Sequence, residues 1–293
     1  MNSQAMSAQR TGVTVSLPRP FLPISVAIAI CFMAGSALSE EATKPNLKDN
    51  DWRLTLGVGA MIAPDYEGSD DYEAIPLPLI DLSWRDKVSI GTLGGPGIKV
   101  NFFKLNGPTP KDFLTLSTAV RYGGGREQDD NDALQGLGDI DGGMMVSLAA
   151  DYQYQDFGVA LAVNRDVTGD REGTTVNAEL HYSFKLGVPR TMLTLGTNLT
   201  WADDDYMGTI FGISAAQAAA SRRGFAAFDA SSGVKDVGVS AKVRHRWDDN
   251  IGLLGQVGYT RLLGDAADSP IVDQDGDAGQ FSALVGLTYS WGW

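Results

Sequence analysis

One short segment places an acid, a base and a nucleophile on a single face of an extended strand. Glu179, His181 and Ser183 occupy alternate positions, and side chains two residues apart in a β-strand point the same way. A histidine beside a serine hydroxyl is the pairing that activates a serine nucleophile. The intervening Leu180 and Tyr182 are apolar, so the spacing equally predicts an amphipathic strand with a polar face and no catalysis. We take the strand as the better explanation.

The sequence gives little support for a metal-binding or a nucleotide-binding site. His181 and His245 are the two histidines of the chain and lie on different predicted strands, without the clustered ligands that a zinc site needs. Gly-rich stretches at residues 91–97 and 122–127 lack the Lys-Ser/Thr pair that ends a phosphate-binding loop. The sequence therefore predicts no metal centre and no cofactor.

The acidic run DQDGDAG resembles the start of a calcium-binding loop through Asp273, Asp275 and Asp277. An EF-hand also needs Gly and Glu at later positions, where this chain has Ala278 and Leu284. An acidic turn explains the run better. With the acidic runs 129–132 and 203–205, it predicts an acidic loop surface, and the binding of divalent cations there is a hypothesis.

These residues are carried by segments in which every second side chain is apolar. Residues 52–60, for example, alternate Trp, Leu, Leu, Val and Ala with Arg, Thr, Gly and Gly. Such alternation predicts β-strands with one apolar face. We predict about twelve strands, with about ten to fourteen compatible with the pattern, at residues 52–61, 74–84, 86–92, 97–105, 113–122, 143–154, 157–165, 174–185, 190–201, 236–247, 250–262 and 280–293.

Two architectures produce such strands: a soluble sandwich or barrel, and a transmembrane barrel with lipid outside and a polar lumen. Many segments alternate over the roughly 9–11 residues of a membrane-crossing strand rather than the roughly 5–6 of a soluble one. Aromatic residues end several segments, and tight connections alternate with long acidic or Gly-rich ones. The sequence therefore predicts an all-β fold in which residues 52–293 form a transmembrane antiparallel up-and-down β-barrel.

Two regions fit this pattern less well. Pro76 and Pro78 lack the N–H that a strand ladder needs, and segment 86–92 between tight connections is short. Within the long 202–235 loop, residues 206–213 are compatible with an added strand element. The Ala-rich run 214–223, which begins with a serine in a capping position, predicts a short helix.

The first 39 residues have the layout of an export signal. Two arginines precede an apolar run, and the small residues Ala37 and Ser39 follow it. We predict cleavage near Ser39, then a periplasmic lead-in at residues 40–51. An uncleaved anchor needs a longer apolar run, and a lipoprotein needs a small residue before Cys31, where the chain has isoleucine.

Charge and cysteine content narrow the functional classes. The chain has 293 residues with 23 Lys and Arg against 36 Asp and Glu, for a net charge of −13. Binding nucleic acid takes clustered basic residues, so no nucleic acid partner is expected. Removing the predicted signal takes away two arginines and the only cysteine, which leaves a net charge of −15. The mature chain has no disulfide framework.

Alternation also assigns side chains to the inside or the outside of the barrel. Outer-membrane barrels typically end on an amphipathic strand with a C-terminal aromatic that the insertion machinery recognises, and the matching residues here are Phe281, Val285, Leu287, Tyr289, Trp291 and Trp293. The opposite parity predicts lumen-lining residues Arg53, Lys99, Arg121, Asp151, Glu179, His181, Lys242, Arg244 and Arg246. Buried charges must be paired or hydrated, so this interior is either an ion-paired plug or a narrow wet pore.

Four separated segments resemble the MipA/OmpV family. They are PDYEGSDDYEAIPLPLIDLSW (64–84), YMGTIFGISAAQAAAS (206–221), GVKDVGVSAKVRHRW (233–247) and YTRLLGDAADSPIV (259–272). The resemblance covers essentially the whole mature chain. It implies an outer-membrane barrel, with no catalytic residues to carry over, and a scaffold role between a murein lytic transglycosylase and a murein synthase.

Three functions follow as hypotheses. The first is a non-enzymatic scaffold that links the Gram-negative outer membrane to murein-processing enzymes. The second is a permeation channel for small solutes, which the polar predicted lumen favours, and the family resemblance implies that these solutes include antibiotics. The third is an outer-membrane lipid hydrolase, which rests on the segment from Glu179 to Ser183 alone. Membrane lipid, lipopolysaccharide and the barrel insertion machinery are expected partners in each case.

Overall fold

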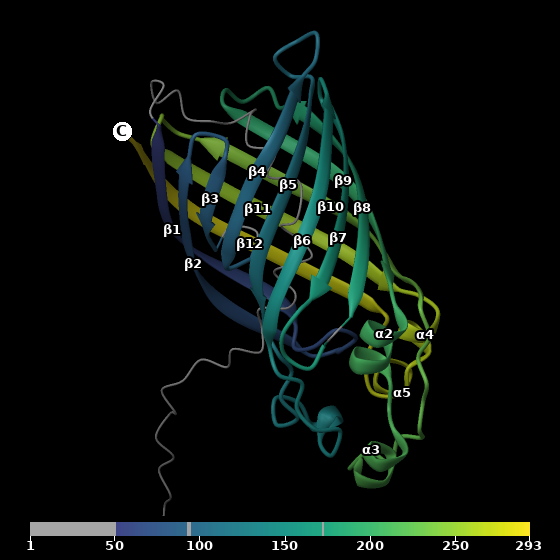
Figure 1. Cartoon of the computed structure of the whole chain (residues 1–293). Helices are drawn as coiled ribbons and strands as arrows, with labels where there is room; N and C mark the ends of the chain where they lie inside the picture. The colour runs from purple at the N-terminus through teal and green to yellow at the C-terminus, as the bar shows by residue number, and fades with distance from the viewer. Residues whose placement is uncertain (1–50, 93–94, 172) are drawn as a thin grey trace, which may run out of the picture.

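The computed structural model describes residues 51–92, 95–171 and 173–293, which form a closed antiparallel barrel of twelve strands (Figure 1). The predicted export signal lies outside the described residues. Each strand pairs with its neighbour in sequence, and the first pairs with the last. The strands are β1 (Trp52–Pro64), β2 (Tyr72–Trp84), β3 (Val88–Gly91), β4 (Gly97–Asn106), β5 (Phe113–Gly123), β6 (Gly143–Tyr154), β7 (Phe157–Asp166), β8 (Thr174–Lys185), β9 (Thr191–Ala202), β10 (Gly233–Arg246), β11 (Ile251–Leu262) and β12 (Gly279–Gly292).

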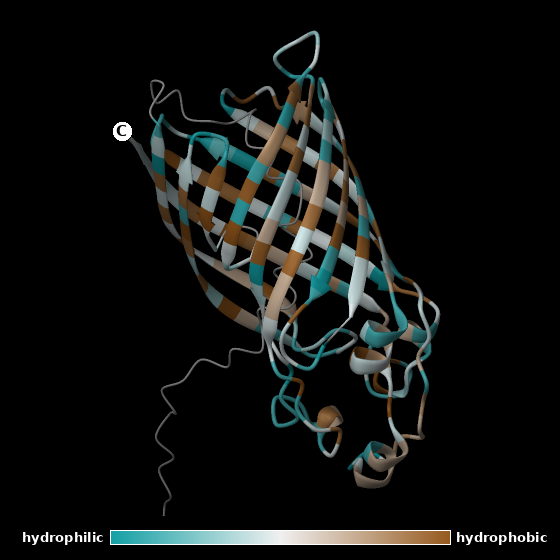
Figure 2. Ribbon diagram, in the orientation of Figure 1, coloured by the Kyte–Doolittle hydropathy of each residue, from teal (hydrophilic) through white to brown (hydrophobic). Residues whose placement is uncertain are grey.

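Period-two alternation turns one face of each strand outward. In β1, Val58 is 71% exposed, whereas Thr55 is 9% exposed and shares a hydrogen bond with Ser290 on the facing β12. Figure 2 shows hydrophobic residues alternating with polar ones along the strands. A sheet with an apolar outside and a polar inside is the arrangement that lipid requires of a closed barrel. The predicted fold class is therefore confirmed.

Tight turns lie at the end of the barrel where β1 begins and β12 ends. Trp52 and Trp293 exchange two backbone hydrogen bonds of 3.1 Å, which join β1 to the residue after β12. Arg85, Gln155 and Arg190 have positive φ values of 49°, 55° and 57°, as reversals over very few residues require. We call this the turn end, and the opposite end the loop end.

The loop end carries the helices of the described chain. They are the 3-10 helix η3 (Asp132–Leu134), α2 (Asp204–Phe211), α3 (Ala215–Ala220), α4 (Asp265–Asp268) and α5 (Pro270–Asp273). The predicted helix at 214–223 is confirmed as α3, capped by Ser214 and Gln217. The strand element considered for 206–213 is instead α2, because Asp203 accepts a hydrogen bond from the Tyr206 amide and caps that helix. None of the helices in the described residues has the length and apolar content needed to cross a membrane.

Glycines in β1 permit a close approach to β12. A Cβ atom added to Gly57 would lie 2.4 Å from the Leu287 carbonyl oxygen, whereas one added to Gly255 meets nothing within 4 Å. Backbone atoms cannot move aside as a flexible side chain can, so substitution at Gly57 must distort the seam that closes the barrel.

We therefore expect Gly57→Ala to lower the free energy of unfolding by about 1–3 kcal/mol. The matched control, Gly255→Ala, should be close to neutral. Urea unfolding of the vesicle-reconstituted barrel, followed by tryptophan fluorescence, measures both. Equal stability of the two variants would contradict the tight seam.

Candidate functional site

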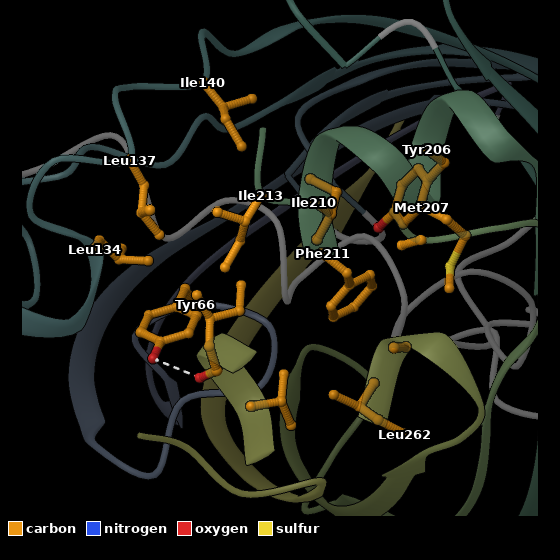
Figure 3. Packing of buried hydrophobic residues seen from close by; sticks show 14 of the residues in the cluster. Tyr66, Leu134, Leu137, Ile140, Tyr206, Met207, Ile210, Phe211, Ile213 and Leu262 are labelled. Carbon is orange, nitrogen blue, oxygen red and sulfur yellow. Dashed lines mark hydrogen bonds between the residues drawn. The ribbon is translucent and has the colours of Figure 1, made fainter. Parts of the chain in front are cut away.

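Four connections that are distant in sequence pack together at the loop end. They follow β1, β5, β9 and β11, and their buried apolar side chains form one cluster, which we call the loop core (Figure 3). Phe211 of α2 and Leu134 of η3 are fully buried in it, and the Tyr66 hydroxyl donates to the Ile271 carbonyl. The loop core comprises Tyr66, Ala133, Leu134, Leu137, Ile140, Ala202, Tyr206, Met207, Ile210, Phe211, Ile213, Phe225, Ala230, Leu262, Ala266, Ile271 and Val272.

The helix α2 is held at its first turn by Asp203. The Asp203 carboxylate accepts hydrogen bonds from the backbone amides of Thr174 and Tyr206, at 2.9 and 3.0 Å. Burial acts to raise the pKa of Asp203, but these two hydrogen bonds outweigh it and hold that pKa below its usual range. The cap thus ties α2 to the end of β8 and aims Tyr206 inward.

Beneath the loop core lies a buried ionic group. The Lys235 side chain is 1% exposed and its ammonium contacts both Glu67 and Asp236, the latter at 2.8 Å. The Tyr206 hydroxyl donates to the second Glu67 oxygen at 2.9 Å. Burial, and then the Glu67 charge, raise the pKa of Tyr206. One lysine therefore links β10, the β1–β2 loop and α2.

Arg126 is a second buried cation at this level. It is 6% exposed, its Nη1 donates to the Ile210 carbonyl at 2.9 Å, and its backbone pairs with Ile140. Its Nε atom has no hydrogen-bond partner within the described part of the chain. Burial lowers the pKa of Arg126 to about 10, opposed by the charges of Tyr66 and Glu67. It remains a cation at neutral pH.

A cavity of about 140 Å³ lies between these cations and the wall formed by β8 to β12. Acidic and basic groups share its lining: Asp65, Glu67, Glu179 and Asp236 against Arg126, Lys235 and Lys242. Charged side chains of both signs and apolar side chains such as Ile210 and Val239 therefore share the lining of this cavity.

A hydrogen-bonded chain of side chains runs along the lumen wall and reaches the larger cavity at Thr200. Arg121 donates a hydrogen bond to Ser147, and Ser147 donates one to Asn164. Asn164 bonds to Asn177 and Asn177 to Thr200, and the distances along the chain are 2.7–3.3 Å. The chain spans five consecutive strands, β5 to β9. A second cavity of about 60 Å³ lies against it. Such a network fixes the lumen side chains in one arrangement.

The predicted lumen residues occupy inward positions of their strands. His181 and Lys242 are buried, Lys99 and Arg121 line the smaller cavity, and Glu179 lines both cavities. The other predicted members, Arg53, Asp151, Arg244 and Arg246, are half-buried. The sequence did not indicate Lys235, Glu67, Tyr206 or Arg126, because all four lie in predicted loops. The predicted strand begins one residue after Lys235, and Arg126 lies in the Gly-rich turn predicted at 122–127.

The Ser183 hydroxyl and the His181 imidazole of β8 use separate partners. His181 Nε2 bonds to Gln153 at 3.2 Å and its Nδ1 lies 3.7 Å from Glu179, whereas Ser183 bonds to Thr194 at 3.0 Å. The serine hydroxyl is thus engaged on the β9 side, away from the imidazole. These contacts fit a polar wall rather than a nucleophile and its base.

The remaining sequence candidates also have structural partners. His245 bonds to Thr191 at 2.8 Å and meets Trp247 edge-on. Asp275 pairs with Arg223 at 2.6 Å, and Asp277 accepts from the Gly279 amide. Across residues 51–92, 95–171 and 173–293, no three His, Cys, Asp or Glu side chains gather in a way that would hold a metal.

The predicted assembly residues of the last strand share one exposed face. Each of Phe281, Val285, Leu287, Tyr289, Trp291 and Trp293 is exposed on the outside of the sheet. The rings of Tyr289 and Trp291 are in tilted contact, with centroids 4.4 Å apart. We keep their recognition by insertion machinery as a prediction.

Removing the buried cation of the ionic group should loosen the loop core. Lys235→Met leaves Glu67 and Asp236 facing each other without a counterion, and breaking a buried pair in this way costs about 3–5 kcal/mol. We expect faster proteolysis of the 203–232 connection in detergent micelles. Lys185→Met, at an exposed position at the turn end, is the control. Unchanged proteolysis of Lys235→Met would contradict the anchoring role.

Alkaline pH should loosen the same region. Burial, and then the charge of Asp275, raise the pKa of Tyr66 to about 12. Folding favours the neutral phenol, so this stability is complete below the ordinary tyrosine pKa of about 10 and is lost as pH rises toward about 12. Tyrosinate absorbance should show a late-titrating phenol that Tyr66→Phe removes. A single titration step at the ordinary pKa would refute this.

Comparisons with known proteins identify a family and several relatives. A family model described as MltA-interacting protein MipA matches residues 56–291. The chain is 25% identical to outer membrane protein OmpV of Vibrio cholerae serotype O1, over 92% of this chain and 98% of that protein. Similar solved structures include OprD from Pseudomonas aeruginosa (14% identity, 82% of this chain, 59% of that chain, TM-score 0.36) and OmpT of Vibrio cholerae (10%, 84%, 99%, 0.35). The protein is located in a Gram-negative outer membrane.

Proposed function

The chain belongs to the MltA-interacting protein MipA family, and from that premise we propose that its barrel is a non-enzymatic anchor for murein-processing enzymes. The family description names MltA, a murein lytic transglycosylase, as the interaction partner. A murein synthase is the second expected partner. By this proposal the barrel holds the enzymes at the membrane and takes no part in their chemistry.

The observation that carries this proposal is the filled loop end. The loop core covers it with packed apolar side chains, and Lys235 joins Glu67, Asp236 and Tyr206 below. A barrel whose outer mouth is held by buried contacts suits an anchor better than a freely open pore. The separate partners of His181 and Ser183 also support a non-enzymatic role.

The turn end is the surface we assign to the partner. Short turns face the periplasm in outer-membrane barrels, where murein lies. Six exposed basic side chains lie there, and four of them form salt bridges with aspartates at the same end. The six are Arg85, Lys87, Lys104, Lys111, Lys185 and Arg190, and the aspartates are Asp51, Asp86, Asp156 and Asp249. Most acidic residues lie in the loops at the other end. A basic periplasmic rim favours an acidic docking surface and faster encounter with it.

Solute permeation is the second candidate function. The cavity of about 140 Å³ beneath Arg126 supports it, because a space lined by charges of both signs can hold a small charged solute. For this role the loop core would have to open. Lipid hydrolysis has the weakest support of the three hypotheses.

Reversing the basic rim should weaken partner capture. We expect the triple variant Arg85→Glu, Lys87→Glu, Lys104→Glu to lose at least about tenfold in crosslinked murein transglycosylase recovered from envelopes, through lost charge complementarity. The control is Arg222→Glu at the exposed loop end, which should retain capture. Equal recovery with both variants would remove the rim from the interface.

Planar bilayer recordings separate the two candidate functions. A folded barrel without discrete openings supports the anchor. Reproducible openings, together with no murein enzyme in the crosslinked fraction, would replace the anchor with a channel.

A further inference from the structure

One lysine inside the barrel is buried without a partner. Lys242 of β10 is 6% exposed and lines the larger cavity, of about 140 Å³. Within the described part of the chain, its ammonium group makes neither a hydrogen bond nor an ion pair. An ammonium group has three N–H donors, and a buried cation is costly unless those donors find acceptors. The cavity must therefore supply the acceptors that the protein does not.

The acidic groups near the loop end of this cavity are engaged elsewhere. Glu67 and Asp236 share the ammonium group of Lys235. Asp236 lies six residues before Lys242 on β10, which is about 20 Å along a strand. Asp65 belongs to the β1–β2 loop and accepts a hydrogen bond from the connection between β5 and β6. These carboxylates therefore do not serve as partners of Lys242.

Glu179 is the acid that faces Lys242, across the strand that separates them. It lies on β8, and β8, β9 and β10 are neighbours in the wall (Figure 1). The charges of Glu179 and Lys242 interact, yet the two groups form no ion pair. The Glu179 side chain is 20% exposed, lies 3.7 Å from His181 Nδ1 and lines the same cavity as Lys242. The cavity thus holds an acid and a base apart.

Gly196 of β9 leaves the space between this acid and base open. A Cβ atom added there would lie 2.9 Å from the Ser240 hydroxyl oxygen and 3.8 Å from Glu179 Oε1, so both polar atoms border the gap. Asn198 and Gln256 lie beside them on the neighbouring strands and also line the cavity. Hydrogen-bonding side chains therefore surround this part of the cavity.

We propose that this part of the cavity binds a small zwitterion that carries the carboxylate and ammonium groups of an α-amino acid. The ligand carboxylate accepts hydrogen bonds from Lys242 and Ser240, and the ligand ammonium group donates to Glu179, whose carboxylate has about four lone-pair positions to share. A simple anion would be repelled by Glu179 and a simple cation by Lys242, so the ligand must carry both charges. This site does not depend on the anchor role of the barrel.

Equilibrium dialysis tests the site with three small radiolabelled probes. They are alanine, propionate, which lacks the ammonium group, and ethylamine, which lacks the carboxylate. The folded protein is dialysed in detergent micelles at neutral pH, with empty micelles as the blank. We expect alanine to bind at least about tenfold more tightly than either other probe, because it alone makes both charge-assisted contacts. Propionate or ethylamine binding as tightly as alanine would overturn the zwitterion, and no binding of any probe would leave Lys242 to water alone and overturn the site.

Two single variants locate the binding site. Lys242→Met and Glu179→Gln should each weaken alanine binding at least about tenfold, because each removes one charged contact. Lys185→Met, at an exposed position at the turn end, should bind alanine as the unmodified protein does. Lys242→Met removes a buried charge without stranding a partner, so the barrel should still fold, which urea unfolding checks. Unchanged alanine binding in either Lys242→Met or Glu179→Gln would overturn the assignment, and the comparison of the three probes in the unmodified protein is independent of both variants.

Discussion

The structure depends on one constraint: inside a bilayer no water is present to satisfy backbone N–H and C=O groups. A twelve-stranded sheet meets it by pairing β1 with β12, and the glycines on that seam let the two backbones approach. The constraint also explains the prolines of β2. Where β3 ends early and leaves an edge unpaired, Pro76 and Pro78 remove the donors that lipid could not satisfy. The unpaired edge of β2 and the prolines are therefore one feature.

A different kind of interaction organises the loop end. There the connections are long enough to fold on one another, and they bury apolar side chains from four parts of the chain. Burial would penalise the charges beneath, so these are paired: Lys235 with Glu67 and Asp236, and Arg171 with Asp166. An occluded barrel mouth excludes water, so the charges buried there must be paired. The lumen wall below stays polar and retains two cavities.

The sequence was sufficient to predict the strands, because each is a local pattern read at period two. Predicted and observed strands differ by only a few residues at their ends, and the Ala-rich α3 was predicted from its capping serine. The candidate site was predicted only in part. Lys235 contacts Glu67 and Arg126 contacts Ile210. These partners are far away in sequence, and no local sequence pattern predicts such long-range contacts. For α2 a local signal existed, since Asp203 precedes two further acids in a capping position, but the apolar residues after it resemble a strand.

Hydrogen–deuterium exchange of the reconstituted protein tests the occluded mouth most directly. Exchange reports the free energy of local opening, and the side chains of the loop core are buried as in a protein interior. It predicts that the backbone amides of Met207 and of the Arg126–Ile140 bridge exchange as slowly as those of the barrel strands. Exchange at these amides as fast as in the exposed turns at the other end would contradict it, because the mouth would then be open for much of the time.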